Sequence, residues 1–468
     1  MMPVVLWTDA LIFLLTSVVV VFVLYARRKP HIRAPWQRVF SGRIAATSVV
    51  ILLGFIVIGL LDSLHFRLSL ADNGNSDETH YSVEVLSVLD VILGPVKTQV
   101  EKTYSAPFAT HLFAKETIEL ADGTQVRDYP RLLYGGRHLP DNGAGKWRDI
   151  LQRSLLALLQ AFMVGAIIFY LAAVLLGRRA NRDSRSMLRA ILARQTRLPW
   201  RTMLTTLTLL VLLVLLAVNL ASAYHVLGTD KVGQDVLYLT LKSIRTGLVI
   251  GTLTTLIMLP FAIFLGIVAG YARGWTDDVV QYVYTTLNSI PGVLLIAASI
   301  LMLQVYVSNH PEYFETTVER ADIRLLFLCI ILGITSWTGL CRLLRGETLK
   351  LRETEYIQAA VSFGVAHGKI ITRHILPNVM HVVLITVVLD FSGLVLAEAV
   401  LSYVGVGVDP TMNSWGNMIN SARLEMAREP VVWWSLMSAF LFMFVLVLAA
   451  NLFSDAVRDA FDPRTRER

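Results

Sequence analysis

Two acidic side chains are the residues of this chain most able to bind or relay an ion. Asp390 and Glu398 lie inside, or near the end of, a long apolar run at 379–400. A charged group in such a run is costly to bury and usually faces a water-filled cavity or a partner helix. The two acids are eight positions apart and so share one broad helix face. They line a solute or ion pathway, or each makes a hydrogen bond between helices; both interpretations stay open here.

No pattern in the sequence supports catalysis or a nucleotide site. Gly143-Ala-Gly-Lys146 is part of a phosphate-loop pattern, but Pro140 replaces the first glycine and Trp147 replaces the magnesium-binding Ser or Thr. The histidines lack metal-ligand spacing. The two cysteines, Cys329 and Cys341, fall in one apolar run, where we interpret them as inert thiols. We therefore predict no catalytic residue, no metal site and no cofactor bound directly by this chain.

A polar stretch between two apolar runs offers a different kind of site, a contact surface for another protein. Residues 355–363 contain neither Pro nor Gly and can form about two helical turns, which Gly364 and Gly368 can end. Small side chains there leave room for another backbone, and apolar ones can anchor it. The small residues are Ala359 and Ala360, and the apolar ones are Tyr356, Ile357, Val361 and Phe363. Periodicity alone leaves open a surface helix that lies on the membrane.

The composition places these candidate sites in a membrane protein. The chain is 55% hydrophobic and only 16% charged, whereas soluble domains carry about 25% charged residues. Nine apolar runs approach the roughly 20 residues needed to cross a bilayer. They are 4–24, 44–61, 155–176, 203–223, 246–268, 283–305, 325–344, 379–400 and 433–452. We predict an all-α polytopic membrane protein with about nine transmembrane helices, in which Pro260 and Pro291 kink the fifth and sixth.

The arginines predict the orientation of these spans. Six basic residues and no acid lie in 27–43, and eight arginines with only Asp183 lie in 178–201. Because basic loops stay cytoplasmic, we predict an extracytoplasmic N-terminus and a cytoplasmic C-terminus. Residues 345–377 then lie on the cytoplasmic side. The N-terminus lacks the basic region and cleavage site of a secretory signal, so we expect the first run to remain as a membrane helix.

A long polar segment, 62–150, is predicted on the extracytoplasmic side. Its stretch 71–79 predicts a loop, and the apolar pattern of 83–92 predicts a short amphipathic helix. The remainder predicts a small mixed domain, interpreted either as a packing element or as a docking surface. The chain thus divides into two N-terminal transmembrane helices (1–61), the extracytoplasmic loop domain (62–150), a third helix with a basic cytoplasmic linker (151–201), and a six-span unit (202–468).

Ordered motifs in the six-span unit resemble those of bacterial ABC importer permeases, in particular the C-type permease of dipeptide, oligopeptide and nickel importers. Glu355-Tyr-Ile-Gln-Ala-Ala360, Gly364 and His374-Ile-Leu-Pro377-Asn378 resemble the EAA signature. The other matching stretches are His225-Val-Leu-Gly-Thr-Asp230 with Gly233-Gln-Asp235, then 269–277, 396–407 and 451–464. Gln358 stands where the signature has Glu, and Gln234 where Arg is usual. The three leading spans and the loop domain fall outside the usual family core.

This resemblance implies a transport subunit of the bacterial inner membrane rather than an enzyme. It implies a second permease, two cytoplasmic ATPases that bind ATP-Mg, an extracytoplasmic solute-binding protein and the lipid bilayer as partners, with no nucleic acid. It also assigns sites. ATPase coupling falls on Glu355, Tyr356, Gln358, Ala359, Ala360, Phe363, Gly364, Gly368, Leu376 and Pro377. The extracytoplasmic motif is Gly228, Thr229, Asp230, Gly233 and Asp235, with Thr229 or Asp230 as the cap of an outer helix.

Two other classes of protein remain as alternatives to an importer of peptides or similar small solutes. The first is an ion-coupled secondary transporter or channel that uses Asp390 and Glu398. The second is a membrane-anchored sensor or scaffold whose working part is the 62–150 domain. The amphipathic loop at 355–368, with its glycines and the following Leu-Pro, is the feature that favours the importer.

Overall fold

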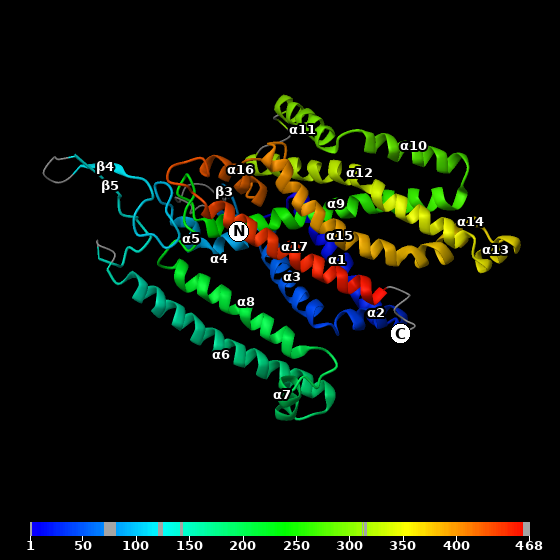
Figure 1. Cartoon of the computed structure of the whole chain (residues 1–468), viewed down its shortest axis with the longest axis horizontal. Helices are drawn as coiled ribbons and strands as arrows, with labels where there is room; N and C mark the ends of the chain where they lie inside the picture. Colours follow the sequence, from blue (N-terminus) through cyan, green and yellow to red (C-terminus); the bar gives the residue numbers. More distant parts are fainter. Residues whose placement is uncertain are drawn as a thin grey trace, which may run out of the picture. The chain divides into compact units, whose positions relative to one another are not determined.

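The computed structural model describes residues 2–69, 81–119, 125–140, 144–310, 312 and 316–461. The chain forms two compact units, each built from three separate segments. The first unit comprises 1–4, 40–246 and 413–449, and the second comprises 5–39, 247–412 and 450–468. Figure 1 follows the elements along the chain by colour. The division into four sequential parts stays a prediction.

Helices dominate both units. In the described part of the chain, nine helices are long and apolar enough to cross a membrane, which confirms the predicted class and number. They are α1 (Trp7–Arg27), α3 (Arg43–Asp62), α6 (Lys146–Ala180), α8 (Trp200–Ala221), α9 (Val236–Ala272), α11 (Gly292–Asn309), α12 (Thr317–Arg352), the combined helix His367–Tyr403, and α17 (Trp434–Phe461). Several exceed the predicted runs, because polar residues at the ends continue the helical hydrogen bonds.

The sixth predicted run is not one kinked helix. Helix α10 (Trp275–Ser289) ends before Pro291, and α11 starts after it. A proline disfavours helical backbone at the residue before it, and Ile290 is extended, with φ −86° and ψ 128°. Pro260, by contrast, lies inside the continuous helix α9. Proline therefore breaks one of the two helices and is tolerated in the other.

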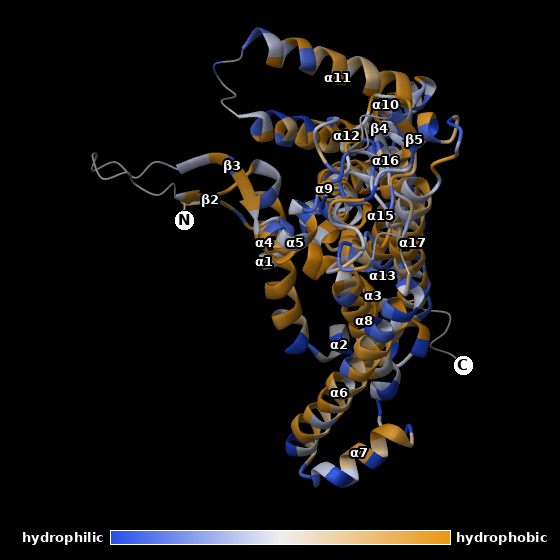
Figure 2. Cartoon of the chain, turned by 90° about the vertical axis from the view of Figure 1, so that its left-hand side faces the viewer, coloured by the Kyte–Doolittle hydropathy of each residue, from blue (hydrophilic) through white to orange (hydrophobic). Residues whose placement is uncertain are grey.

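The first unit contains a long helical hairpin. Helices α6 and α8 pack against each other, α7 (Ser184–Leu192) joins their ends, and α3 packs on α8. The close approach requires a small residue, because a Cβ on Gly165 would lie 2.6 Å from Cγ2 of Thr208. Figure 2 shows the apolar colour along α6 and α8 and the mixed colour of α7.

The 62–150 segment of the first unit contains both strands and short helices. Strands β1 (Met2–Val4), β2 (His65–Ser69) and β3 (Tyr81–Ser87) form an antiparallel sheet in that order, and β4 (Glu116–Glu119) pairs with β5 (Gln125–Asp128). The helix predicted over 83–92 is wrong for its first half, because residues up to Ser87 pair with β2. Helix α4 (Val88–Ile92) starts only there, behind a capping box of Ser87 and Asp90. The predicted loop 71–79 lies outside the described residues.

Short helices complete the first unit. Helix α5 (Gly94–Thr98) follows α4, and α16 (Trp415–Glu425) precedes the start of α17. Two fully buried tryptophans fix these segments to the chain around the start of α9. The indole N–H of Trp415 donates to the carbonyl of Thr240 at 3.2 Å, and that of Trp434 to the carbonyl of Thr229 at 2.9 Å.

The second unit is built around α12. Helix α2 (Pro30–Val39) follows α1, and the remaining elements are α13 (Glu355–Ser362), α14 (His367–Ile370), the π-helical turn η2 (Ile371–Ile375) and α15 (Leu376–Tyr403). Helix α1 packs on α12, where Thr8 donates its backbone N–H and hydroxyl to the carboxylate of Asp322. One buried apolar cluster, which includes Met258, Trp337 and Leu340, lies where α9, α12 and the start of α15 meet.

Candidate functional sites

The 355–368 segment forms the short helix that the sequence predicts. Helix α13 spans Glu355–Ser362, and Gly364 follows it with φ +75°, a conformation that favours glycine and ends the helix. Gly368 does not end a helix as predicted, since it lies inside α14. The two glycines therefore play different parts in the backbone.

Most apolar side chains of α13, and that of Phe363, which follows it, are left uncovered by the other described residues. Phe363 is 87% exposed, Tyr356 46% and Val361 45%. Ala359 is also exposed, and Gln358 lies beside it on the surface. Among the described residues, these side chains form an apolar surface at the end of a helix-rich unit.

One predicted anchor has a different place. Ile357 is fully buried and belongs to the apolar cluster that contains Trp337 and Leu340. It attaches α13 to its own unit rather than offering a contact to a partner. The alternation of exposed and buried residues follows the helical period, so α13 packs through one face and presents the other.

Polar contacts fix the same segment to the corner between α9 and α10. The hydroxyl of Tyr271 lies 2.7 Å from Nδ1 of His367, and the guanidinium of Arg352 donates to the carbonyl of Tyr271 at 2.8 Å. Arg273 forms an ion pair with Glu353. The motif at 269–277 therefore contacts both ends of α13 through its immediate neighbours.

A bidentate ion pair holds the base of this corner. Arg345 donates to both oxygens of Asp277, at 2.5 and 2.6 Å. Hydrogen bonding from Arg345, stronger than the opposing effect of burial, lowers the pKa of Asp277 below its usual value. A paired guanidinium and carboxylate of this geometry resist separation more than a single contact does.

The stretch His374-Ile-Leu-Pro377 lies within one helical path. The helix of this span already begins at His367, so Pro377 lies inside it rather than at its start. Pro377 instead follows the π-helical turn η2, and Leu376, just before it, packs against the apolar cluster. Proline lacks an N–H and clashes with the carbonyl four residues earlier, and a wider turn gives that carbonyl room.

Gln358 and Tyr356 make weak contacts with their own unit. The side-chain N–H of Gln358 donates to the carbonyl of Glu353 at 3.3 Å. The hydroxyl of Tyr356 accepts from the amide of Asn378 at 3.2 Å. Both side chains are exposed, so each contact contributes little to folding.

The 225–235 motif has a buried charged centre. Nδ1 of His225 lies 2.7 Å from Asp235, and Nε2 lies 3.3 Å from Oε1 of Glu101. The same Glu101 carboxylate accepts the backbone N–H groups of Leu133 and Tyr134, each at 2.8 Å. Glu101 belongs to the 62–150 domain, which is thereby attached to the motif.

The charges of this centre are mutually stabilising. Burial alone would lower the pKa of His225, but Asp235 and Glu101 outweigh it and raise the pKa to about 9. Burial would raise the pKa of Glu101, but His225 and three backbone N–H groups lower it below its usual value. At neutral pH an imidazolium therefore lies between two carboxylates.

Neither Thr229 nor Asp230 caps a helix as predicted. Asp230 accepts two backbone N–H groups inside the turn that precedes α9. The hydroxyl of Thr229 donates to the carbonyl of Thr103 at 2.8 Å. The side chain that caps α9 is Asp235, whose Oδ1 accepts the N–H of Leu237 at 2.8 Å. The turn at 230–234 delays the helix by several residues.

The glycines of this motif allow the 62–150 domain to approach. Gly228 and Gly233 have φ of +73° and +77°. A Cβ on Gly233 would lie 1.8 Å from the carbonyl oxygen of Glu101, and one on Gly228 2.4 Å from that of Ser105. A larger residue at either position would push the two backbones apart.

Sequence reasoning missed a second buried ion cluster in the first unit. The ammonium of Lys242 lies 2.6 Å from Asp62 and 3.1 Å from Asp90. Ser87 donates to Asp62 at 2.7 Å and is 3.2 Å from Lys242. Burial would raise the pKa of Asp90, but Lys242 and the N–H of Ser87 lower it. Glu101 and these residues are scattered along the chain, so no spacing pattern reveals them.

The two acids of α15 do not form a paired site. Eight residues of helix separate their Cα atoms by about 12 Å along the axis. Glu398 is buried and accepts a hydrogen bond from Ser402 at 2.8 Å. Asp390 is half-buried, beside an exposed stripe that contains Leu389, Gly393 and Leu396. A pathway role for either acid stays a prediction.

The long apolar helices define a polytopic membrane protein, and the helical segment at 355–377 leaves apolar side chains exposed. Residues 262–467 match the family described as binding-protein-dependent transport system inner membrane component. The chain belongs to this family and is a membrane-spanning permease subunit of an ATP-binding-cassette importer. It is a multi-pass inner-membrane protein, and ATP hydrolysis resides in partner subunits.

Curated proteins of the same family are similar to about half of this chain. The oligopeptide transport system permease protein OppC of Haemophilus influenzae is 32% identical over 243 residues, 52% of this chain and 71% of that protein. OppC of Mycobacterium tuberculosis is 33% identical over 242 residues, 52% and 77% of the two chains. The glutathione transport system permease protein GsiD of Pectobacterium atrosepticum is 31% identical over 245 residues, 52% and 74%.

Proposed function

We propose that this chain and a second permease form the pathway of an importer for peptides or similar small solutes. The 355–368 segment couples this pathway to two ATPase subunits that bind ATP-Mg. The exposed apolar surface of α13, with Phe363 at 87% exposure, is the observation that carries the coupling proposal. Aromatic side chains of this kind supply much of the binding energy when a partner covers them.

The contacts of α13 suit the transmission of movement. Ile357 fixes the helix to the apolar cluster, and Tyr271 with His367 joins it to the α9–α10 corner. A partner that shifts α13 would therefore move α9 and α15 with it, as a rigid body rather than a flexible loop. The exposed Ala359 lets the partner's backbone approach closely. Leu376 and Pro377 lie where this movement enters the long helix of α15.

The solute class comes from the relatives. Their names specify oligopeptide, dipeptide and glutathione transport, so a peptide is the solute class we assign to this chain. Delivery by an extracytoplasmic solute-binding protein would place that partner on the side of the 62–150 domain and the 225–235 motif. Asp390, beside the exposed stripe of α15, is the acid we place nearest the pathway.

The arginine clusters support the orientation. The basic segments 27–43 and 178–201 both place their loops in the cytoplasm under the positive-inside rule. The N-terminus is then extracytoplasmic, the C-terminus is cytoplasmic, and α13 lies on the side of the ATPases. This agreement between separate loops supports the topology more than any single span does.

Co-purification of the ATPase subunits with variants of α13 tests the proposal. Phe363→Asp and Ala359→Glu place charge on the exposed surface and should remove the ATPases while membrane insertion persists. Leu192→Glu, at another exposed apolar residue on the proposed cytoplasmic side, is the matched control and should retain them. Full ATPase recovery and solute-stimulated hydrolysis in both α13 variants would refute the coupling role.

A further inference from the structure

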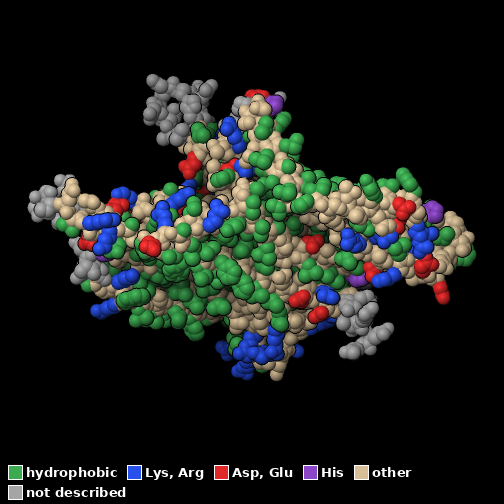
Figure 3. All heavy atoms as spheres, turned by 45° about the horizontal axis from the view of Figure 1, so that its top comes forward, with side chains coloured by type: hydrophobic (Ala, Val, Ile, Leu, Met, Phe, Trp, Pro, Cys, Tyr) green, Lys and Arg blue, Asp and Glu red, His purple; other side chains and the backbone are tan. Residues whose placement is uncertain are grey.

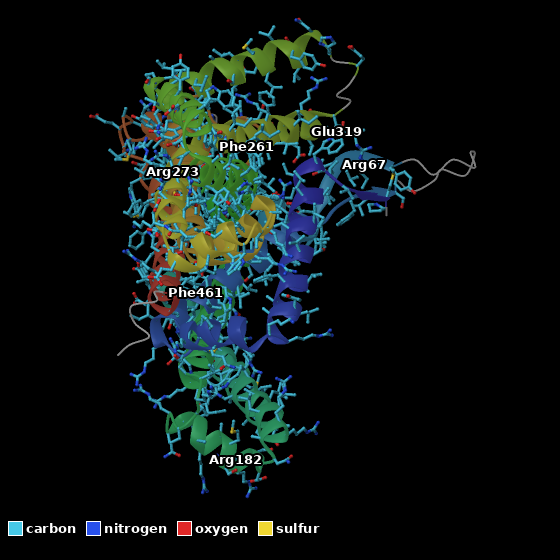
Figure 4. All side chains as sticks on the ribbon, turned by 90° about the vertical axis from the view of Figure 1, so that its right-hand side faces the viewer. Arg67, Arg182, Phe261, Arg273, Glu319 and Phe461 are labelled. Atoms are coloured by element: carbon cyan, nitrogen blue, oxygen red, sulfur yellow. The ribbon has the colours of Figure 1, made fainter. Side chains whose placement is uncertain are left out.

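A dense group of arginines lies at the α7 end of the α6–α8 hairpin. Eight arginines and a single acid, Asp183, occupy residues 178–201. Figure 3 shows blue side chains gathered below the middle of the view, where α7 lies, and Figure 4 labels Arg182 at this end of the hairpin. All eight arginines are exposed, and we call the six within residues 178–194 the arginine patch. They are Arg178, Arg179, Arg182, Arg185, Arg189 and Arg194.

A folded element holds part of this patch in place. On α7, Ile191 is fully buried in an apolar cluster with Ala173 of α6 and Leu204 of α8. Arg185 and Arg189 are one helical turn apart and exposed, away from that cluster. Arg185 and Arg189 therefore project from an amphipathic helix, whereas Arg182 and Arg194 lie in the short connections on either side of it.

No carboxylate in the described part of the chain neutralises the positive charge of the patch. Within the described residues, none of its six arginines forms an ion pair with a carboxylate. Asp183 is occupied as the cap of α7, where its carboxylate accepts the backbone N–H of Arg185 at 3.2 Å. The patch is therefore available to anions from outside the chain.

The surface next to the patch is apolar and open. Leu171 and Leu175 of α6 are 53% and 62% exposed, and Arg178 follows within one helical turn, about 5 Å along the axis. An acyl chain that lies along α6 would therefore bring its phosphate to the arginines. Guanidinium groups bind phosphate through paired hydrogen bonds.

We propose that the arginine patch binds the headgroups of anionic phospholipids, with their acyl chains on the exposed face of α6. The apolar face of α6 runs directly into unpaired arginines. A lipid can cover the apolar face with its acyl chains and bind the arginines through its phosphate, whereas an acidic protein surface would bind only the arginines. An amphipathic helix with arginines on its polar face is suited to the headgroup region. The patch would hold the hairpin at a fixed depth in the bilayer.

Lipid retention by the intact transport complex tests this proposal. The complex is exchanged into nanodiscs of phosphatidylcholine and phosphatidylglycerol, and the lipids that remain bound are counted by native mass spectrometry. Arg185→Gln with Arg189→Gln should lower the preference for phosphatidylglycerol about tenfold. Arg185→Lys with Arg189→Lys should keep most of it. Raised salt should weaken the preference in the unmodified protein.

A matched control removes the same charge from the 62–150 segment, where the exposed basic residues do not follow an apolar membrane helix. Lys115→Gln with Arg127→Gln should leave the preference for phosphatidylglycerol unchanged. An unchanged preference in the α7 glutamine variant would overturn the proposal, as would an equal fall in the control, because generic charge would then be responsible. A loss of the ATPases from the α7 variant at unaltered lipid preference would also overturn it, in favour of an acidic protein partner.

Discussion

Two motifs of this permease each contain a glycine in the left-handed backbone conformation, but the surroundings of the two glycines differ. Gly233 has φ +77° and Gly364 has φ +75°. A Cβ at Gly233 would lie 1.8 Å from the carbonyl oxygen of Glu101, whereas one at Gly364 would meet nothing within 4 Å. The first motif is closed by the chain's own 62–150 domain. The second faces open space, as a partner surface requires.

The side chains of the two motifs differ in the same way. His225 is 1% exposed and lies between two carboxylates, so the 225–235 motif satisfies its polar groups internally. Phe363 is 87% exposed, so the 355–368 segment leaves apolar surface unsatisfied. Substitutions in the 225–235 motif should therefore lower the stability of the fold, and substitutions in the 355–368 segment should weaken binding of a partner.

The largest expected effect is on Gly233. Gly233→Ala should lower the free energy of unfolding by about 4 kcal/mol, because overpacking against the Glu101 backbone adds to left-handed strain. Gly364→Ala carries only the strain and should cost about 1 kcal/mol. Chemical denaturation in mild detergent measures both. Equal losses of unfolding free energy in the two variants would contradict the view that Gly233 is tightly packed and Gly364 is not.

The Lys242 cluster should give a slightly smaller effect. Lys242→Met leaves Asp62 and Asp90 buried without their cation, which should cost about 3 kcal/mol of unfolding free energy. Adding Asp62→Asn and Asp90→Asn to the same variant should recover part of that loss, because no unpaired charge then remains. A triple variant that is less stable than the single one would contradict this reading of the cluster.

The pH dependence of stability should report His225. Its folded-state pKa is raised to about 9, above the unfolded value of 6.5, so its contribution is complete below pH 6.5. That contribution should be lost as the pH rises through about 9. The free energy of unfolding, measured from pH 6 to 10, should fall more steeply with rising pH for the unmodified protein than for His225→Gln. Parallel curves would show that His225 is not charged in the folded state.

The smallest effect is expected at Gln358. Its exposed amide makes only long hydrogen bonds to Glu353, at 3.3 and 3.5 Å, so Gln358→Glu should change the unfolding free energy by less than about 0.5 kcal/mol. Thermal unfolding of the two proteins side by side checks this. A larger loss would mean that the Gln358 amide holds α13 in place.

Local patterns were sufficient to predict much of the fold. The nine apolar helices and the two turns of α13 follow from hydrophobic length and from helix-compatible residues ended by Gly364. The strand at 81–87 was mistaken for helix because its short apolar run fits both periods, and only pairing with β2 decides between them. Pro291 breaks a helix while Pro260 does not, a difference that depends on packing around each proline.

The candidate sites divide in the same manner. The exposed surface of α13 lies on consecutive residues, so the sequence could indicate it, apart from Ile357, whose burial depends on α12. Glu101, Asp62, Asp90 and Lys242 are brought together only by the tertiary fold, and single charged residues in loops carry no local sign of burial. Asp235 rather than Thr229 caps α9, because Asp230 closes the intervening turn by accepting two of that turn's backbone N–H groups and Thr229 donates to the distant Thr103.

Cysteine labelling at position 363 tests the central claim most directly. The native Cys329 and Cys341 are buried, so they should not react with a maleimide under mild conditions. Phe363→Cys should react freely in permease lacking the ATPases and at least tenfold more slowly in the full complex. Val83→Cys, 81% exposed on β3 in the unmodified protein, should react equally in both. An equal rate at position 363 with and without the ATPases would show that they do not cover α13.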